Sequence, residues 1–320
     1  MKKLYMFLIA IICASIFSCA KKEAPKKENE KITVVATIFP PYDFVRAVAG
    51  DNVNLSMLLP PAAESHSFEP TPKDIIAAQN SDLFVYIGGE SEVWVDRILE
   101  SSKMEKTRVL ALIDTVNALE EEIVEGMEEE EEEEASEGAE EEAEYDEHIW
   151  TSVRNAKIMA ASILGALCEI DEANASEYKE NFALFASSLD ALDGEFSQTV
   201  GKAKYKTIIF GDRFPFRYFA EDYGLSYFAA FPGCSTETEP SASTVAFLID
   251  KVKAENLPVV FHIELSNEKM ADAITEATGA KKLLLHSAHN ISKSDFEKGR
   301  TYLEIMQDNV ENIKIALAAD

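Results

Sequence analysis

The sequence predicts an α/β protein with two parallel-sheet domains joined by one long helix. First, short apolar runs rich in β-branched residues alternate with segments of helical periodicity in both halves of the 320-residue chain. Second, this alternation is typical of parallel sheets, because consecutive parallel strands need a crossover helix between them. Third, residues 175–200 form one amphipathic segment midway, and a helix of that length spans about 39 Å. We therefore expect an N-terminal domain at 32–168, a linker helix at 169–203 and a C-terminal domain at 204–320.

Four apolar runs are the expected strands of the first half. They cover residues 31–39, 54–59, 83–87 and 108–113. Helical spacing follows the first and third runs, at 42–49 and 91–99. Another helix is expected to start at Thr71 and Pro72, since threonine is a favoured N-cap and proline suits the first helical position.

A tract of glutamates interrupts the pattern at residues 120–147. It holds 18 acidic residues and no Lys or Arg, and the net charge of the whole chain is −28. Such a tract repels itself and buries no core, so we expect a disordered loop. The negative charge also argues against nucleic acid as a partner, because affinity for nucleic acid depends on Lys and Arg at the phosphates.

The second half repeats the alternation. A helix at 155–167 precedes the long helix at 175–200. Four further strands are expected at residues 206–210, 226–231, 258–263 and 281–285. Four further helices are expected at residues 214–223, 241–255, 267–277 and 294–317, the last capped by Ser294.

The first 31 residues have the features of an export signal and a tether. Two lysines precede a short apolar run, and Cys19 ends residues 1–19 as in a bacterial lipoprotein signal. Residues 20–31 are polar and charged, as a tether should be. We expect a lipid anchor on Cys19 and a protein held outside the cytoplasmic membrane, in the periplasm or on the cell surface. Cys168 and Cys234 are expected to be free or buried thiols.

Imidazoles and one carboxylate follow the ends of the expected strands. Ligands of parallel sheets bind where the carboxyl ends of the strands meet. The candidates are His66 after the second strand, His148 after the fourth, Asp212 after the fifth, and His286 and His289 after the eighth. His262 lies within the seventh strand, so we interpret it as structural. Together they predict one metal ion in the interdomain cleft. Zinc suits four tetrahedral N, O or S ligands, whereas manganese accepts more oxygen.

Six segments carry a resemblance to a known family over most of the chain. They are TIFPPYDFVRAVAGD (37–51), ESHSFEPTPKDI (64–75), DEHIW (146–150), RYFAEDYGL (217–225), TETEPSA (236–242) and ATGAK (277–281). With them the chain resembles the metal-binding lipoproteins of bacterial ABC transporters for zinc and manganese. The resemblance implies a protein that captures a divalent metal, Zn²⁺ with Mn²⁺ as the alternative, and delivers it to a membrane permease. We expect it to be a monomer.

The resemblance also implies a ligand set. His66 matches the first ligand of the family and His148 the second. Arg213 stands where the family usually has a third histidine, and because a charged guanidinium cannot bind a cation, Asp212 beside it is the better candidate. His286 falls at the fourth position, with His289 able to serve instead or as well. The glutamate tract takes the place of a metal-collecting loop, so it either attracts cations weakly or is a solvated spacer.

Three other functions compete with metal capture by a zinc-binding protein. One is a manganese-specific protein of the same family, and another is a surface adhesin with the same fold. The third is a metallohydrolase with Glu64 as general base, which would keep an open position on its metal. No Ser-His-Asp order, HExxH motif or phosphate loop is present in the sequence, so we expect a binding protein and not an enzyme.

Overall fold

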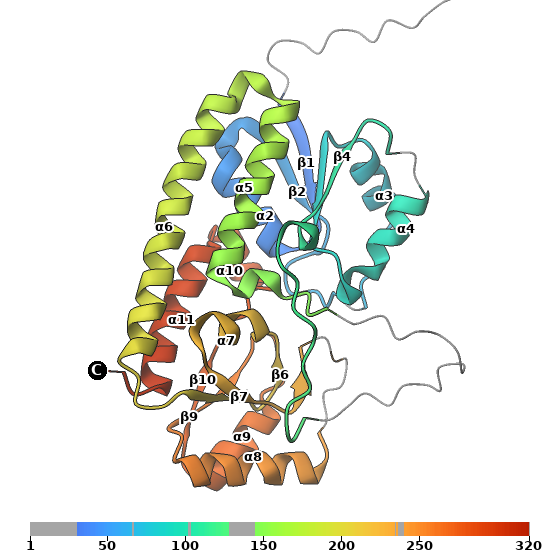
Figure 1. Cartoon of the computed structure of the whole chain (residues 1–320). Coiled ribbons are helices and arrows are strands. Elements are labelled where there is room, and N and C mark those ends of the chain that lie inside the picture. The colour runs from blue at the N-terminus through green and yellow to red at the C-terminus, as the bar shows by residue number, and fades with distance from the viewer. Residues whose placement is uncertain are drawn as a thin grey trace, which may run out of the picture. The chain divides into compact units, whose positions relative to one another are not determined.

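A computed structural model shows the fold of the chain (Figure 1). It describes residues 31–65, 67–101, 104–127, 145–233, 235 and 240–319. The expected signal and Cys19, the ligand candidate His66, Cys234 and the glutamate run at 128–144 lie outside these residues. The chain divides into Met1–Lys31 and Ile32–Asp320, and the described helices and strands belong to the second unit. Of these described helices, none combines the length and the apolar character that a bilayer crossing needs.

The first half contains the four-stranded parallel sheet that the sequence predicts. Its strand order is β2-β1-β3-β4, and every neighbouring pair is parallel. The strands are β1 (Ile32–Ala36), β2 (Val53–Met57), β3 (Leu83–Tyr86) and β4 (Arg108–Ala111). β1 is central and buried, in keeping with its run of β-branched residues.

Three helices connect the successive strands of this sheet: α2 (Phe39–Ala49), α3 (Pro72–Gln79) and α4 (Val93–Ser101). The expected first strand ends early, because Pro40 and Pro41 are accommodated in the first turn of α2. α3 begins as predicted: Thr71 caps it, and Asp74 completes a reciprocal capping box.

Two long antiparallel helices, α5 (Val153–Ile170) and α6 (Ala175–Gly201), connect the halves (Figure 1). The buried residues of α6 include Phe185 and Phe196. Phe185 packs on Phe44 of α2 with 5.9 Å between ring centroids, whereas Phe196 packs on Phe219 of the second half at 4.9 Å. One helix therefore contributes to the cores of both halves. The predicted domain limits at 168 and 204 stay predictions.

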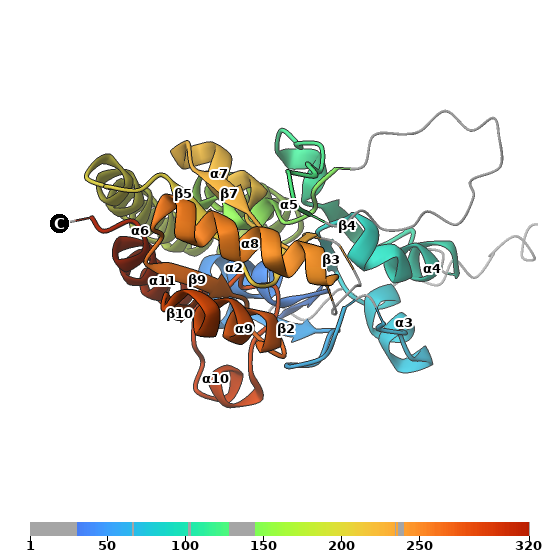
Figure 2. The same ribbon diagram turned by 90° about the horizontal axis from the view of Figure 1, so that it is seen from below.

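The second half contains short parallel strands in the pairs β5–β7 and β10–β9. They are β5 (Thr207–Ile209), β7 (Ser226–Phe228), β9 (Val259–His262) and β10 (Lys281–Leu284). A parallel bridge between Phe210 and Phe261 joins the two pairs, and Gly211 N–H donates to Phe261 O at 2.8 Å. Two shorter strands, β6 (Arg213–Phe214) and β8 (Phe231–Pro232), pair just beyond β5 and β7. α8 (Ala242–Glu255) and α9 (Lys269–Thr278) lie across these strands (Figure 2).

Two predicted helices differ from those observed. The helix expected at 214–223 is α7 (Arg217–Tyr223), because Arg213 and Phe214 belong to β6. The closing helix expected at 294–317 with Ser294 as cap is wrong. It is two helices, α10 (Lys293–Glu297) capped by Ser292 and α11 (Tyr302–Ala316) capped by Thr301. Gly299 separates them with a φ of 73°, a left-handed conformation that a helix cannot contain.

The acidic tract is not wholly disordered, so that prediction is wrong for its two ends. Glu120 forms an antiparallel bridge with Tyr145. Glu122 accepts a hydrogen bond from Tyr227 Oη at 3.0 Å and pairs with Arg217 at 3.1 Å. Glu125 pairs with Lys251 at 3.1 Å. These cationic and tyrosine partners lie on α7, β7 and α8. Residues 116–127, which we call the strap, therefore fasten the end of the first sheet to the second half.

Candidate metal-binding site

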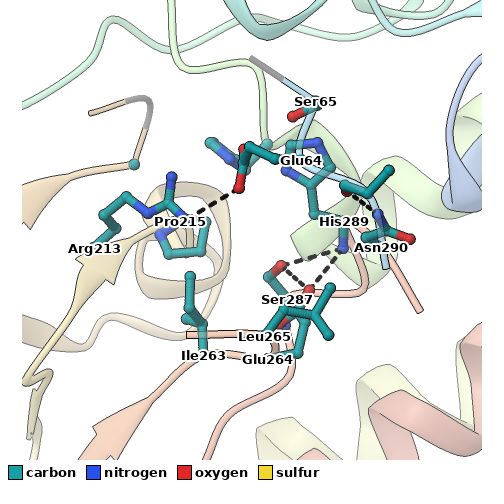
Figure 3. A pocket seen from close by; sticks show the side chains of 13 residues that line it. Glu64, Ser65, Arg213, Pro215, Ile263, Glu264, Leu265, Ser287, His289 and Asn290 are labelled. Atoms are coloured by element: carbon teal, nitrogen blue, oxygen red, sulfur yellow. Dashed lines mark hydrogen bonds and ion pairs between the residues drawn. The ribbon is translucent and has the colours of Figure 1, made fainter. Parts of the chain in front are cut away.

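A small cavity lies where loops from the two halves meet (Figure 3). Its volume is about 60 Å³. Pockets for organic ligands usually measure about 300–1,000 Å³, so this cavity suits an ion with its ligands. Its ionisable lining residues are Glu64, His148, Arg213, Glu264 and His289.

His148 enters the cavity wall from the first half and is held by its neighbour Asp146. The side chain is 2% exposed. Asp146 Oδ1 accepts the backbone N–H of His148 at 2.7 Å and lies 3.1 Å from its Nδ1. Burial alone would lower the pKa of His148, but the Asp146 carboxylate, with Glu147 nearby, raises it above the ordinary value. When Nδ1–H donates to Asp146, Nε2 keeps its lone pair for a cation, as in many metal-binding histidines.

Gly233 makes room for this imidazole. A Cβ at Gly233 would lie 3.1 Å from both Cε1 and Nδ1 of His148, and 3.0 Å from Phe214 O. Because the backbone carbonyl cannot move away as a flexible side chain could, a larger residue at this position would push on the His148 ring.

Trp150 joins His148 to His289 of the second half. Its ring centroid lies 5.3 Å from that of His148 and 5.2 Å from that of His289, and the two imidazoles are 5.7 Å apart. Trp150 Nε1–H also donates to Ser287 O at 2.8 Å. The side chain is fully buried. Two histidines that are far apart in the sequence are thus fixed side by side at one cavity.

The other two described candidates do not line this cavity. His286 Nδ1 accepts the backbone N–H of Ala288 at 3.0 Å, which occupies one ring nitrogen in closing its own turn. Asp212 accepts the N–H groups of Arg213 at 2.9 Å and Ile263 at 3.3 Å, and it lines a separate neighbouring cavity of about 260 Å³. His66 lies outside the described residues, although Glu64 and Ser65 before it line the first cavity.

Sequence reasoning missed Glu264, the carboxylate two residues beyond the end of β9. Its place just after the seventh expected strand was the available signal, because the other candidates were found in that way. His262, at the end of β9, has its Nδ1 3.0 Å from Ile263 O and does not line the cavity. Arg213 Nη1 donates to Ser235 O at 3.1 Å, and its Nη2 lies 4.0 Å from Oε2 of Glu64, which also lines the cavity. Within the described ranges, no three His, Cys, Asp or Glu side chains gather as a metal-binding group.

Comparison with known proteins gives the family. The profile described as "ZnuA: Zinc-uptake complex component A periplasmic" matches residues 34–316. The chain belongs to this family. The family is a periplasmic component of zinc uptake by its own description.

Two curated relatives show how far the likeness extends. The high-affinity zinc uptake system protein ZnuA of Bacillus subtilis (strain 168) is 33% identical over 316 residues, covering 98% of this chain and 97% of the relative. The zinc-binding lipoprotein AdcA of Streptococcus pneumoniae serotype 4 is 28% identical over 314 residues. That match covers 98% of this chain but 61% of AdcA, so the chain spans about three fifths of the length of this relative.

Solved structures share the fold of this ZnuA-family chain. The metal-dependent lipoprotein YcdH from Bacillus subtilis has a TM-score of 0.75 and 30% identity, covering 90% of this chain and all of that one. The Zn(II)-bound ZnuA-like domain of Streptococcus pneumoniae AdcA has a TM-score of 0.72 and 26% identity, covering 90% and 99%. The chain thus shares its α/β fold, with parallel sheets and a long helix, with these solved structures.

Proposed function

We propose that this chain captures a divalent transition metal ion, zinc, outside the cytoplasmic membrane and delivers it to an ABC permease. The observation that carries the proposal is the meeting of His148 and His289, from separate halves, at an ion-sized cavity. Neutral imidazole is the commonest transition-metal ligand. The names of the relatives support zinc as the cargo, and the lipid anchor on Cys19 remains part of the proposal.

Among the ligands expected from the sequence, the geometry favours His148 and His289. His66 completes three imidazoles in the proposal, because the residues before it line the same cavity. A fourth ligand would come from a lining carboxylate, Glu64 or Glu264, or from water. His286 and Asp212 stay predictions, and their hydrogen bonds to nearby backbone favour a supporting role.

Zinc is favoured over manganese by the balance of nitrogen and oxygen ligands. Three imidazoles with one oxygen are typical of zinc, whereas manganese prefers sites richer in carboxylate and water. A manganese-bound neighbour of 22% identity shares the fold, so both metals belong in any binding assay. The cavity volume of about 60 Å³ also favours an ion over the organic substrate of a hydrolase.

An adhesin function is the second candidate. A laminin-binding protein of Streptococcus agalactiae, described as a bifunctional protein with adhesin and metal transporting activity, shares the fold with a TM-score of 0.73 and 27% identity. Metal capture and adhesion are therefore compatible on this fold. A pure adhesin need bind no metal, so the stoichiometry of bound zinc separates the two.

The test is zinc binding by the purified protein, measured by elemental analysis and by competition with a chromogenic chelator. We expect one tightly bound zinc per chain. His148→Ala and His289→Ala should each weaken zinc binding on the order of 100-fold or more, because each removes one of about four ligands. His262→Ala is the matched control, since His262 lies in the same half as His289 but outside the cavity. Unchanged zinc affinity in both cavity variants would overturn the proposal.

A further inference from the structure

We propose that Glu264 is a positioning residue that fixes the turn carrying His289, and that its carboxylate thereby sets the metal affinity of the site. This inference rests on the proposed function. Glu264 follows β9, whereas the turn follows β10, so the contact joins the ends of two neighbouring parallel strands. The Glu264 side chain is 9% exposed, which keeps water from competing strongly for its hydrogen bonds.

Both oxygens of Glu264 are directed at the turn (Figure 3). Oε2 accepts the backbone N–H of Ser287 at 2.7 Å. Oε1 accepts Ser287 Oγ–H at 2.6 Å and the backbone N–H of His289 at 3.1 Å. Hydrogen bonds to an ionised carboxylate are roughly twice as strong as neutral ones. Three of them on two residues define where the His289 backbone lies.

The backbone conformation of the turn shows why the three hydrogen bonds of Glu264 are needed. Ala288 has a φ of 61°, a left-handed conformation that costs an L-residue with a Cβ about 1–2 kcal/mol. The Ala288 N–H is taken by His286 Nδ1 at 3.0 Å. Three successive N–H groups, of Ser287, Ala288 and His289, are thus satisfied by side chains: Glu264 accepts the first and third, His286 the second, and the Ser287 hydroxyl shares the third. Without the carboxylate, the turn would relax toward ordinary backbone angles and carry His289 with it.

The hydrogen bonds of Glu264 to the turn also determine which histidine faces the cavity. His286 is turned toward Ala288 N, whereas His289 lies against Trp150 and His148. Ser287 stands between them, with its carbonyl held by Trp150 and its N–H and hydroxyl held by Glu264. The Trp150 indole from the first half and the Glu264 carboxylate from the second therefore hold the same residue of the turn.

A role as ligand is the alternative for Glu264, and Ser287→Ala separates the two. This variant keeps the carboxylate but removes the hydroxyl that donates to Oε1 and accepts the His289 N–H at 3.1 Å. If Glu264 positions the turn, Ser287→Ala should weaken zinc binding about fivefold, because the carboxylate loses one of its three hydrogen bonds to the turn. If Glu264 acts only as a ligand, Ser287→Ala should bind zinc as the wild type does, and the positioning role is overturned.

The experiment compares Glu264→Gln with Glu304→Gln in the full chain. Glu304 Oε2 accepts the backbone N–H of Thr301 at 2.8 Å and its hydroxyl at 3.1 Å, the same chemistry away from the cavity. Zinc affinity is measured by chelator competition, the absorption spectrum of bound Co²⁺ reports ligand geometry, and thermal unfolding of the apo protein reports the fold.

Glu264→Gln should weaken zinc binding about 10–100-fold, the usual effect of losing a group that orients a ligand, and should change the Co²⁺ spectrum. Glu304→Gln should change neither. If Glu264→Gln lowers the unfolding temperature but binds zinc and Co²⁺ as the wild type does, the carboxylate is merely structural and the inference fails. If the wild type itself binds no zinc, the proposed function fails instead.

Discussion

A buried carboxylate, that of Glu92, should make the stability of the protein depend on pH. Glu92, in the short 3₁₀ turn Glu90–Glu92, is 2% exposed. Its Oε2 accepts the N–H groups of Ile87 at 2.8 Å and Gly88 at 3.0 Å. Burial, with a smaller contribution from the charge of Glu147, raises the pKa of Glu92 from 4.5 to about 7. Glu147 in turn accepts the N–H of Ser91 at 2.8 Å, which ties the turn to the residue before His148.

The sign and size of the effect follow from linkage between protonation and folding. Below pH 4.5 both the folded and unfolded chains are protonated at Glu92, so this group does not make the free energy of unfolding depend on pH. Between pH 4.5 and 7 the unfolded chain releases the proton that the folded chain keeps, and stability falls as pH rises. The two pKa values and about 1.4 kcal/mol per pH unit give a total loss of about 3 kcal/mol.

Glu92→Gln should remove this part of the pH dependence. The amide oxygen can keep the bonds to Ile87 and Gly88, and the side chain stays neutral at every pH. The free energy of unfolding is measured by urea titration at pH 5 and pH 8, with Glu90→Gln as an exposed control in the same turn. From pH 5 to pH 8, the free energy of unfolding of the variant should rise by about 2–3 kcal/mol relative to that of the wild type. An equal stability difference at both pH values would refute the reasoning.

Two further predictions concern the Trp150 contact and the acidic tract. Trp150→Phe removes the indole N–H from Ser287 O, so it should cost about 1–3 kcal/mol of stability for the unsatisfied buried carbonyl and should weaken zinc binding. Trp94→Phe, which loses a bond to Ser91 O three residues away, should leave zinc binding unchanged, and equal zinc affinities in the two variants would contradict this role of Trp150. Deleting residues 128–144 while keeping the strap and Tyr145 should leave the unfolding temperature, measured by calorimetry, and the zinc dissociation constant, measured by titration, as in the wild type. The contacts of the strap with Tyr145, Tyr227 and Lys251 involve no deleted residue. A large fall in unfolding temperature would show that the deleted tract is structural.

Local sequence signals predicted most of the fold. The β-branched runs that predicted β1 and β3 lie in the sheet core, and Thr71 caps α3 as its position before Pro72 indicated. The closing helix was predicted wrongly because its apolar periodicity continues across Gly299. The Thr301–Glu304 capping box was the local signal for a new helix.

Long-range contacts were beyond prediction from the sequence. Glutamates at 120–125 have the composition of a disordered loop, but Arg217, Tyr227 and Lys251 hold them. Spacing likewise placed His286 and His289 together after the eighth strand without choosing between them. In the proposal that choice depends on how Glu264, from the loop after β9, binds the turn.

Anomalous diffraction at the zinc edge from crystals of the zinc-loaded protein tests the proposed metal site most directly. We predict a single zinc peak in the cavity between the halves, with imidazole nitrogens of both His148 and His289 at about 2.0–2.1 Å. A zinc ion bound by residues of one half alone, or bound away from these two histidines, would contradict it.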